Sequence, residues 1–244
     1  MSLPFTFYLK PYTLGLHFFI MSYYPIYLEL KGKTVLVVGG GSVARRKVET
    51  LLEYGAEVNI VSKELTPQLR ELVEAGKIRQ IGEEFFDKHL DSAFLVYAAT
   101  DDMQLNREIS QSARKRGIMI NAVDQPADCD FIVPSIVRKG DLSIAVSTSG
   151  KSPALAKSIR KQLDLQFGNE YQTFLALMGR LRKEILSSGL SQEENSRIFH
   201  KIVNSGILKA LAEDNLEEVE AILRQTVPEN VDLKKCLEVK RGKL

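Results

Sequence analysis

Four side chains that can transfer protons or bind metal ions lie within seven residues of one another. They are Asp124, Asp128, Cys129 and Asp130, in the stretch NAVDQPADCDFIVPSI. Carboxylates act as general bases in enzymes, and both carboxylates and thiolates act as metal ligands. Three adjacent residues cannot all face one ion without contorting the backbone, and no histidine lies nearby. The last three of these residues are therefore predicted to form a polar turn, and no metal site is expected.

The first acid, Asp124, directly follows the apolar run IMINAV, residues 118–123, which is predicted to be a strand. Parallel α/β sheets bind their ligands at the carboxyl ends of their strands. A carboxylate in that place is well positioned to act as a general base. The alternative is that Asp124 only shapes the turn ahead of Pro126, as aspartate often does.

A glycine-rich segment, VVGGGSVARRKVETLL, places Gly39, Gly41 and Ala44 at the spacing G-x-G-x-x-A, between a predicted strand and a predicted helix. In dinucleotide-binding folds the first glycine permits the tight turn and the second lets a pyrophosphate approach the backbone. The third small residue lets helix and strand pack closely, and the helix N-terminus faces the phosphates. The segment predicts a dinucleotide site. The alternative is a tight turn without a ligand.

The acid that usually binds the adenosine ribose, about 20 residues further on, is missing from its expected place. Ser62 occupies that place, Lys63 follows it, and Glu64 comes two residues late. The motif alone therefore leaves NAD and NADP both open, because Lys63 would tolerate a 2′-phosphate.

Strands and helices alternate along the first half of the chain. Short apolar runs bounded by glycine or polar residues predict strands at residues 33–38, 57–62, 77–82, 93–99 and 118–123. Amphipathic segments between them predict helices, one ending at Gly55 and others at residues 65–75 and 103–116. This alternation predicts an α/β fold with a Rossmann-type parallel sheet.

The pattern changes after residue 125. Two apolar runs, residues 131–137 and 142–146, predict a β-hairpin, and Pro134 makes its first strand an edge strand. A helix then starts with Ser152 as its N-cap and Pro153 as its first residue. Helices are predicted to continue to about residue 225, followed by a loose basic tail, KKCLEVKRGKL.

Composition sets broad limits on partners and compartment. The chain has 244 residues and a net charge of +2, so its total charge gives no reason to expect nucleic acid or a membrane as a partner. Its two cysteines, Cys129 and Cys236, form neither a CxxC motif nor a disulfide framework, which predicts a reducing, cytoplasmic location.

The first 20 residues are aromatic and apolar, but a lysine, a proline and a histidine interrupt them. The uninterrupted run is too short to span a membrane. We predict an over-extended start or a disordered extension, the alternative being an interfacial anchor.

Four motifs, in this order, resemble the precorrin-2 dehydrogenase family of siroheme biosynthesis: VVGGGSVARRKVETLLEYGAEV, YAATDDMQLN, NAVDQPADCDFIVPSIV and IAVSTSGKSPALAKSIRKQL. The resemblance is close over residues 23–165 and loose beyond them. It implies an NAD-dependent oxidoreductase that takes a hydride from precorrin-2, a porphyrin-like tetrapyrrole, to give sirohydrochlorin. Some members of the family are also ferrochelatases that insert Fe²⁺, and the family is usually a homodimer. No methyltransferase-like region follows, so the resemblance is to the stand-alone form.

The resemblance also implies roles for particular residues. It makes Asp124 the catalytic acid, and it assigns NAD contacts to Ser42, Val43, Lys63 and Glu64. We add four residues of the glycine loop and the strand ends to the cofactor site, namely Gly39, Gly41, Ser62 and Thr100.

A tetrapyrrole with many carboxylates calls for cationic and hydroxyl side chains. The residues predicted to bind the substrate are Arg45, Arg138, Ser147, Thr148, Ser149 and Lys151. The alternatives are that the cations belong to solvated helix faces and that the hydroxyl-rich loop only caps the next helix.

These inferences predict an N-terminal extension over residues 1–20, an NAD-binding domain over 21–125, a hairpin and helix dimerisation region over 126–165 and a helical domain over 166–244. Two other functions fit the glycine loop, a nucleotide-sensing regulatory module without catalysis and another NAD(P) oxidoreductase on the same fold. The sequence leaves open whether chelatase activity is present, and whether residues 1–20 are native.

Overall fold

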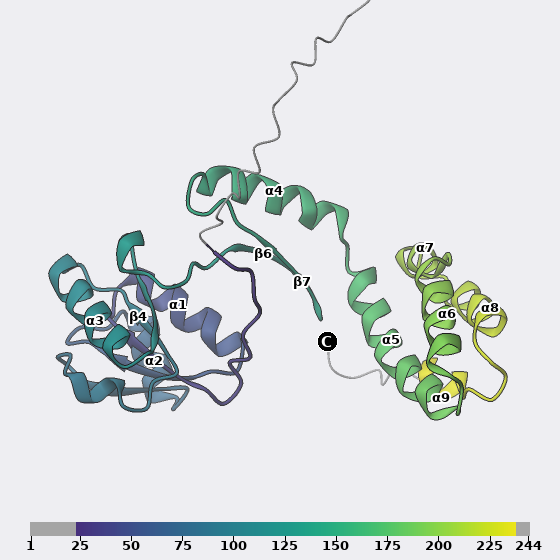
Figure 1. Cartoon of the computed structure of the whole chain (residues 1–244), viewed down its shortest axis with the longest axis horizontal. Coiled ribbons are helices and arrows are strands. Elements are labelled where there is room, and N and C mark those ends of the chain that lie inside the picture. The colour runs from purple at the N-terminus through teal and green to yellow at the C-terminus, as the bar shows by residue number, and fades with distance from the viewer. Residues whose placement is uncertain (1–22, 238–244) are drawn as a thin grey trace, which may run out of the picture. The chain divides into compact units, whose positions relative to one another are not determined.

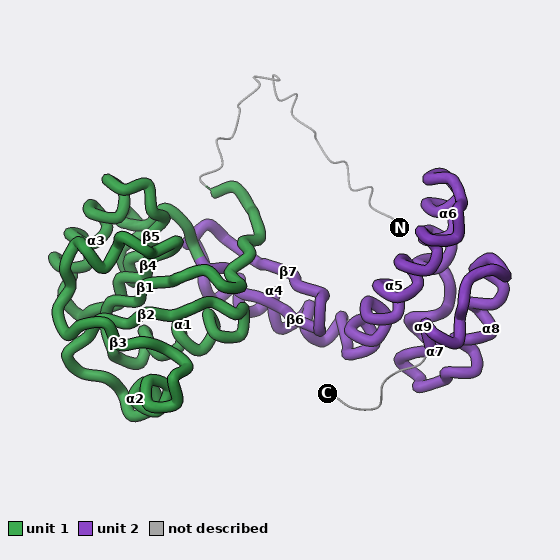
Figure 2. The backbone as a smooth tube through the Cα atoms, turned by 90° about the horizontal axis from the view of Figure 1, so that it is seen from below, with its two compact units in different colours: residues 1–132 green, residues 133–244 purple. Residues whose placement is uncertain are grey.

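The computed structural model describes residues 23–237 of the chain (Figure 1). The predictions for residues 1–20 and for the last seven residues of the basic tail lie outside this range. The described residues form two compact units that divide between Ile132 and Val133 (Figure 2). The finer boundaries within them stay predictions.

A parallel sheet forms the centre of the first unit. Within the described residues it has five strands in the order β3-β2-β1-β4-β5. Their bounds are Thr34–Val38 for β1, Glu57–Val61 for β2, Ile78–Gly82 for β3, Leu95–Ala98 for β4 and Met119–Ala122 for β5. The strand order reverses between β1 and β4, which is where doubly wound sheets open a crevice for ligands. The prediction of a Rossmann-type sheet is confirmed.

Helices cover both faces of this sheet because alternate strand residues point to opposite sides. The helices are α1, Ser42–Glu53, α2, Pro67–Glu74, and α3, Met103–Lys115, and the short 3₁₀ turns are η1, Asp87–Leu90, and η2, Pro126–Asp128. Val35 and Val37 pack with the buried residues of α1 and α2. Leu36 and Val38 pack on the other face with α3. Both layers consist mainly of close-packed apolar side chains, which support the strands behind the edge where they end.

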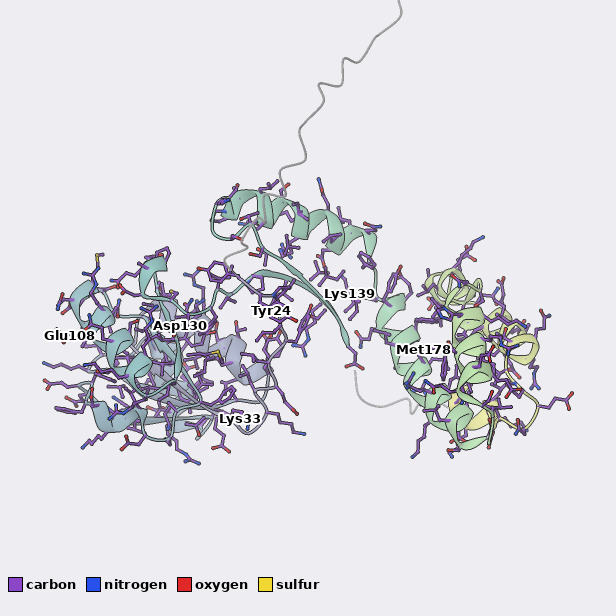
Figure 3. All side chains as sticks on the ribbon, in the orientation of Figure 1. Tyr24, Lys33, Glu108, Asp130, Lys139 and Met178 are labelled. Carbon is purple, nitrogen blue, oxygen red and sulfur yellow. The ribbon has the colours of Figure 1, made fainter. Side chains whose placement is uncertain are left out.

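The second unit begins with an antiparallel hairpin of β6, Ser135–Lys139, and β7, Leu142–Val146, against which α4, Pro153–Gln166, packs. The first strand is shorter than predicted, because residues 131–134 lie outside it. Pro134 has no N–H to donate to a ladder, and Phe131 instead packs against the core of the first unit. Lys139, which is labelled in Figure 3, forms an ion pair with Asp164 of α4 at 3.0 Å.

The remaining helices surround an apolar core of their own. They are α5, Glu170–Ser187, α6, Gln192–Val203, α7, Ile207–Ala212, α8, Leu216–Thr226, and α9, Leu233–Leu237. No helix within residues 23–237 is both long and apolar enough to cross a membrane.

The prediction of a loose tail is wrong at its start. The residues from Lys234 to Leu237 belong to α9, and Cys236 is fully buried. Arg180 of α5 donates from Nε to the carbonyl oxygen of Cys236 at 2.6 Å. Leu233, Cys236 and Leu237 have the i, i+3, i+4 spacing of an apolar helix face. The prediction of a loose tail followed the basic composition of the segment and did not use this short pattern.

We expect Leu181→Ala to lower the free energy of unfolding by about 2–5 kcal/mol, because it empties a fully buried site in the helical core. The matched control is Leu165→Ala, whose side chain is 89% exposed and whose replacement should change stability by less than about 0.5 kcal/mol. Urea unfolding followed by circular dichroism measures both. Equal losses would contradict the placement of Leu181 in the core.

Candidate functional site

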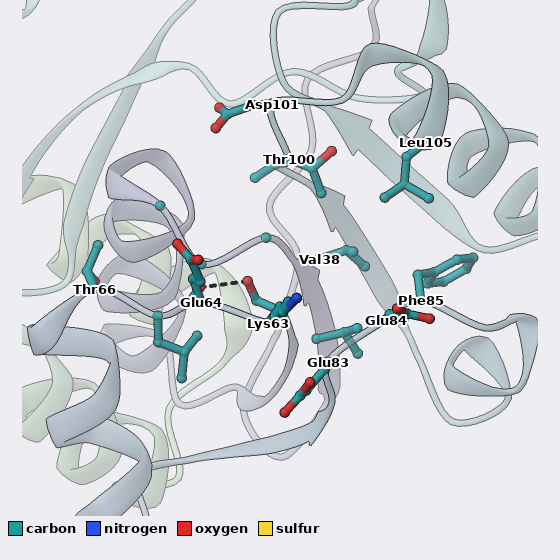
Figure 4. A pocket seen from close by; sticks show the side chains of 17 residues that line it. Val38, Lys63, Glu64, Thr66, Glu83, Glu84, Phe85, Thr100, Asp101 and Leu105 are labelled. Atoms are coloured by element: carbon teal, nitrogen blue, oxygen red, sulfur yellow. Dashed lines mark hydrogen bonds between the residues drawn. The ribbon is translucent and has the colours of Figure 1, made fainter.

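A pocket of about 700 Å³ opens at the carboxyl edge of the parallel sheet (Figure 4). This volume is within the usual range for small-molecule sites. Six of the predicted cofactor residues line it, namely Gly39, Gly41, Ser62, Lys63, Glu64 and Thr100. Ser42 and Val43 are outside its lining and form the first turn of α1.

The three glycines of the loop have different physical roles. Gly39 has a φ of 116°, and a Cβ there would overlap the carbonyl group of Ala99. A Cβ on Gly40 would overlap the carbonyl oxygen of Glu64. Gly41, the N-cap of α1, has no described residue within 4 Å of such an atom. Gly39 and Gly40 are therefore required by the protein itself, while the open side of Gly41 suits a ligand that approaches the backbone.

Hydrogen bonds hold the loop after β2 in its place beside the glycine loop. The backbone N–H of Thr66 donates to the carbonyl oxygen of Gly40 at 3.0 Å. The Ser62 hydroxyl donates to the carbonyl oxygen of Glu64 at 2.7 Å, and Gln80 donates from Nε2 to the carbonyl oxygen of Ser62 at 2.9 Å. Gly40 was not singled out from the sequence, because its close contact is with a residue 24 positions away.

Asn106 of α3 holds the loop that follows β4. Its side chain is 1% exposed, and Nδ2 donates to the carbonyl oxygen of Thr100 at 3.0 Å. Its Oδ1 accepts from the backbone N–H of Thr100 at 3.2 Å and from the hydroxyl of Thr100 at 2.7 Å. The role of Asn106 was not predicted from the sequence. The available signal was its spacing of six residues from Thr100 within the motif YAATDDMQLN.

The lining is acidic. Among the lining residues that the structure describes are four carboxylates, from Glu64, Glu83, Glu84 and Asp101, and one ammonium group, from Lys63. Glu83 and Glu84 were missed, because they follow β3, and the sequence did not show that β3 ends beside β2. The pairing of Val61 with Gly82 brings these acids beside Ser62 and Lys63.

His89 of η1 supports this acidic segment. It is 8% exposed, its Nδ1 accepts from the backbone N–H of Phe86 at 3.1 Å, and its ring meets those of Phe85 and Phe86 edge-on. Burial lowers the pKa of His89, and the nearby ammonium of Lys88 lowers it further. The neutral ring is therefore the form that fits this loop.

The carboxylate of Asp124 is exposed at the same edge of the sheet. Val123 donates to the carbonyl oxygen of Ala98 at 2.9 Å, so the turn begins directly beside the end of β4. The glycine loop after β1 is two strand spacings away, about 10 Å. Asp124 has a φ of 59°, in the left-handed region that aspartate tolerates better than most residues. Within residues 23–237 its carboxylate has no hydrogen-bonding or ionic partner, which leaves it available to a ligand.

The other three groups of the opening motif make local contacts. Asp128 and Asp130 form ion pairs with Arg107 and Arg114 of α3, at 3.4 Å and 2.8 Å. The Cys129 thiol donates to the carbonyl oxygens of Ala122 and Gln125, and burial raises its pKa. These are the contacts of a polar turn. Across the described residues, no group of three or more His, Cys, Asp or Glu side chains is arranged to hold a metal ion.

A half-buried cation that is not among the predicted substrate-binding residues lies on the α1 face of the sheet. The Nζ atom of Lys47 is 5.4 Å from the centroid of the Tyr97 ring, which also meets Phe131 edge-on. Burial lowers the pKa of Lys47, with a further lowering from Arg46, and burial raises the pKa of Tyr97 to about 12. Both groups are thus held away from water beside the strand that leads to the pocket.

The residues predicted to bind substrate belong to both units. Arg45 lies on α1 and forms an ion pair with Glu49 at 3.4 Å. The others are on β6 and in the loop between β7 and α4, namely Arg138, Ser147, Thr148, Ser149 and Lys151.

Hydrogen bonds within the loop between β7 and α4 define the shape of that loop. The hydroxyl oxygen of Ser147 accepts from the N–H of Ser149 at 3.0 Å, and that of Thr148 accepts from the N–H of Ser152 at 3.1 Å. Ser152 then caps α4 by accepting from Leu155. The loop therefore leads into the cap of α4, as one of the alternatives expected. Within the described residues, the hydroxyl oxygens of Ser147 and Thr148 act as acceptors, so their hydrogens are available to donate to a ligand.

Comparison with known proteins gives consistent matches. Residues 26–135 match a family described as putative NAD(P)-binding, and residues 139–164 match the sirohaem biosynthesis protein central family. The siroheme synthase of Photorhabdus laumondii is 35% identical over 210 residues, which cover 86% of this chain and 45% of the relative. That of Methylobacillus flagellatus is 40% identical over 184 residues, 75% of this chain and 39% of the relative. The chain thus spans less than half the length of these relatives.

A solved structure titled "SirC, precorrin-2 dehydrogenase" matches with a TM-score of 0.68 and 26% identity. The match covers 82% of this chain and 100% of that one. None of these comparisons supports a regulatory module without catalysis.

We expect Gly40→Ala to destabilise the protein by about 1–3 kcal/mol, because the added methyl group overlaps the backbone of Glu64. It should also weaken NAD⁺ binding, since the loop must shift. Gly41→Ala is the matched control and should change stability by less than about 1 kcal/mol, while weakening NAD⁺ binding about tenfold or more, equivalent to 1.4 kcal/mol. Thermal unfolding and calorimetric titration with NAD⁺ measure the two effects. Undiminished NAD⁺ binding by Gly41→Ala would argue against a ligand at the open side of the loop.

The lowered pKa of His89 predicts a pH dependence of stability. Its folded-state pKa lies below the ordinary value of 6.5, so unfolding takes up a proton more readily as the pH falls. The stabilisation is complete above about pH 6.5 and declines as the pH falls through the folded-state pKa. His89→Asn keeps an acceptor without titrating, so the loss of Tm between about pH 7 and about pH 5, on either side of the ordinary histidine pKa, should be smaller in the variant. Identical slopes would show that His89 does not contribute.

Proposed function

The chain belongs to the precorrin-2 dehydrogenase family of siroheme biosynthesis, and on this premise we propose that it oxidises precorrin-2 to sirohydrochlorin with NAD⁺ as the hydride acceptor. The observation that carries the proposal is the shared edge of the parallel sheet. There the glycine-loop pocket and the exposed carboxylate of Asp124 lie about two strand spacings, or about 10 Å, apart. A dinucleotide in the pocket and an acid next to it are the two parts that such an oxidation needs.

The lining residues fit a dinucleotide. The open side of Gly41 at the N-terminus of α1 suits a pyrophosphate, since the first backbone N–H groups of a helix attract anions. A bound nicotinamide supplies the hydride acceptor, and the protein supplies its position.

The charges of the pocket favour NAD over NADP. Four carboxylates against one ammonium group would repel the additional phosphate of NADP. Lys63 alone would attract it, but Glu83 and Glu84 flank the same strand ends. In place of the acid missing after β2, the acids after β3 supply the negative charge.

The oxidation also releases a proton, and we assign its acceptance to Asp124. An exposed carboxylate at the carboxyl end of a strand can reach a ligand in the crevice and act as a general base. The same anion is suited to steering Fe²⁺, as a substrate, into sirohydrochlorin. We include this ferrochelatase step in the proposal as a second activity.

The substrate brings many carboxylates, and we propose that the cationic and hydroxyl side chains predicted from the sequence recognise them. The hydroxyl hydrogens of Ser147 and Thr148, whose oxygens already accept backbone N–H groups, are suited to donate to carboxylates. Arg45, Arg138 and Lys151 would supply positive charge, with Ser149 at the left-handed turn of the loop. A cytoplasmic location and a homodimer complete the proposal.

We expect Asp124→Asn to reduce kcat for precorrin-2 oxidation by about 10²–10⁴-fold, the usual contribution of a positioned general base. Asparagine tolerates the left-handed backbone as aspartate does, so Tm and the Kd for NAD⁺ should stay unchanged. Sirohydrochlorin absorbance, followed with NAD⁺ and no added metal, is the measurement.

The unmodified protein and a parallel assay with NADP⁺ are the controls. Turnover by the unmodified protein and by Asp124→Asn at equal rates would reject Asp124 as the base. NAD⁺ binding without any turnover of precorrin-2 would reject the dehydrogenase itself. Addition of Fe²⁺ to sirohydrochlorin then tests the chelatase step separately.

A further inference from the structure

The residue after the proposed base is an almost fully buried amide. Gln125 is 6% exposed, although it sits in a surface turn between two exposed neighbours, Asp124 and Pro126. A buried glutamine is uncommon unless its polar groups are bonded. The contacts of this side chain therefore call for an explanation.

Gln125 connects three separate segments. Its Nε2 donates to the carbonyl oxygen of Met103, the first residue of α3, at 3.1 Å. Its backbone N–H donates to the carbonyl oxygen of Ala122 at the end of β5, at 3.3 Å. Its own carbonyl oxygen accepts from the N–H of Asp128 at 2.9 Å and from the thiol of Cys129 at 3.3 Å. The turn that carries Asp124 is thus fixed to the sheet, to the polar turn and to α3.

The link to α3 leads directly to the cofactor pocket. Asp102, the residue before Met103, caps α3 by accepting from the N–H groups of Gln104 and Leu105. The two residues before it, Thr100 and Asp101, line the pocket. A single side-chain hydrogen bond therefore joins the turn of the proposed base to the helix start that borders the cofactor.

Stability does not account for this choice of residue. The Oε1 atom of Gln125 is buried and has no hydrogen-bond partner among the described residues, which is unfavourable. Rotation of the amide would not help, because it would turn the oxygen toward the carbonyl of Met103. An apolar side chain of similar length would fill the same space without an unpartnered oxygen. What it would lack is the Nε2 donor.

We propose that Gln125 is a positioning residue that holds the turn of Asp124 at a fixed distance from the cofactor pocket through its hydrogen bond to Met103. The inference rests on the proposed function, in which Asp124 is the base. The hydrogen bond to Met103 restrains a turn in which Asp124 has a left-handed backbone. A backbone of this conformation persists only where its surroundings hold it. Gln125 does not itself need to touch the substrate.

The test is Gln125→Met, which keeps an unbranched side chain of similar size but removes both the donor and the unpartnered oxygen. We expect Tm to be equal to or higher than that of the unmodified protein. The Kd for NAD⁺ should stay within about twofold, because the pocket lining is unchanged. The kcat for precorrin-2 should fall by about 10- to 100-fold, the cost of displacing a catalytic group by about 1 Å, with a smaller change in KM. Amide hydrogen exchange should become faster at Asp128, whose N–H bonds to the backbone of residue 125.

Asn195 offers a matched control in the other unit. It is 7% exposed, and its Oδ1 is likewise buried without a partner in the part of the chain that the structure describes. Asn195→Leu removes an unpartnered amide oxygen far along the chain from the turn, so kcat and exchange at Asp128 should stay as in the unmodified protein. This separates the effect of removing a buried amide from the effect of releasing Asp124.

The outcomes distinguish this inference from the proposed function. If the unmodified protein oxidises precorrin-2 and Gln125→Met does so with the same kcat, the positioning role is overturned. A fall in kcat accompanied by a comparable loss of Tm and of NAD⁺ affinity would also overturn it, in favour of a general structural role. If the unmodified protein never oxidises precorrin-2, the proposed function fails. Exchange at Asp128 then still tests the hydrogen bond of Gln125 to Met103 as a restraint on the turn. Unchanged exchange in Gln125→Met would overturn this restraint, and faster exchange would support it.

Discussion

The cofactor pocket depends on two backbone carbonyl groups that lie where side chains would otherwise be. The carbonyl groups of Ala99 and Glu64 occupy the positions that Cβ atoms would take on Gly39 and Gly40. The loops after β1, β2 and β4 can meet only because these two residues have no side chain. Hydrogen bonds from Thr66 and Asn106 then hold the neighbouring loops in place. The apolar layers on both faces of the sheet keep the strand ends from moving apart.

The turn around Asp124 follows a different principle. The glycine loop is tightly packed, whereas this turn combines a left-handed aspartate with a buried amide whose oxygen has no partner within residues 23–237. Neither feature favours stability. Residues held in less favourable states are common where a side chain must be presented to a ligand. The polar turn after it, with Asp128 and Asp130 paired to arginines of α3, secures the segment on its other side.

The acidic pocket shows how the charge of a site can be supplied by a neighbouring strand. An acid after β2 commonly recognises the ribose of NAD, and this chain has Ser62 and Lys63 there instead. Glu83 and Glu84 follow β3, and the pairing of β2 with β3 brings them to the same edge. Charge at a site depends on which strand ends are adjacent, so it can be supplied from a different part of the chain.

The sequence by itself determined the elements and most of the cofactor loop. Runs of β-branched residues, the G-x-G-x-x-A spacing and the Ser152-Pro153 helix start are local signals, since each depends on residues within one turn or one strand. The parallel sheet, the hairpin and the helical region followed from them. Only the tertiary structure decided which distant residues meet: Gly40 with Glu64, and Gln125 with Met103. It also placed Cys236 in the helical core, where the sequence suggested a loose tail. These contacts join residues that lie apart in the chain, and close packing and buried hydrogen bonds, which no local pattern encodes, select them.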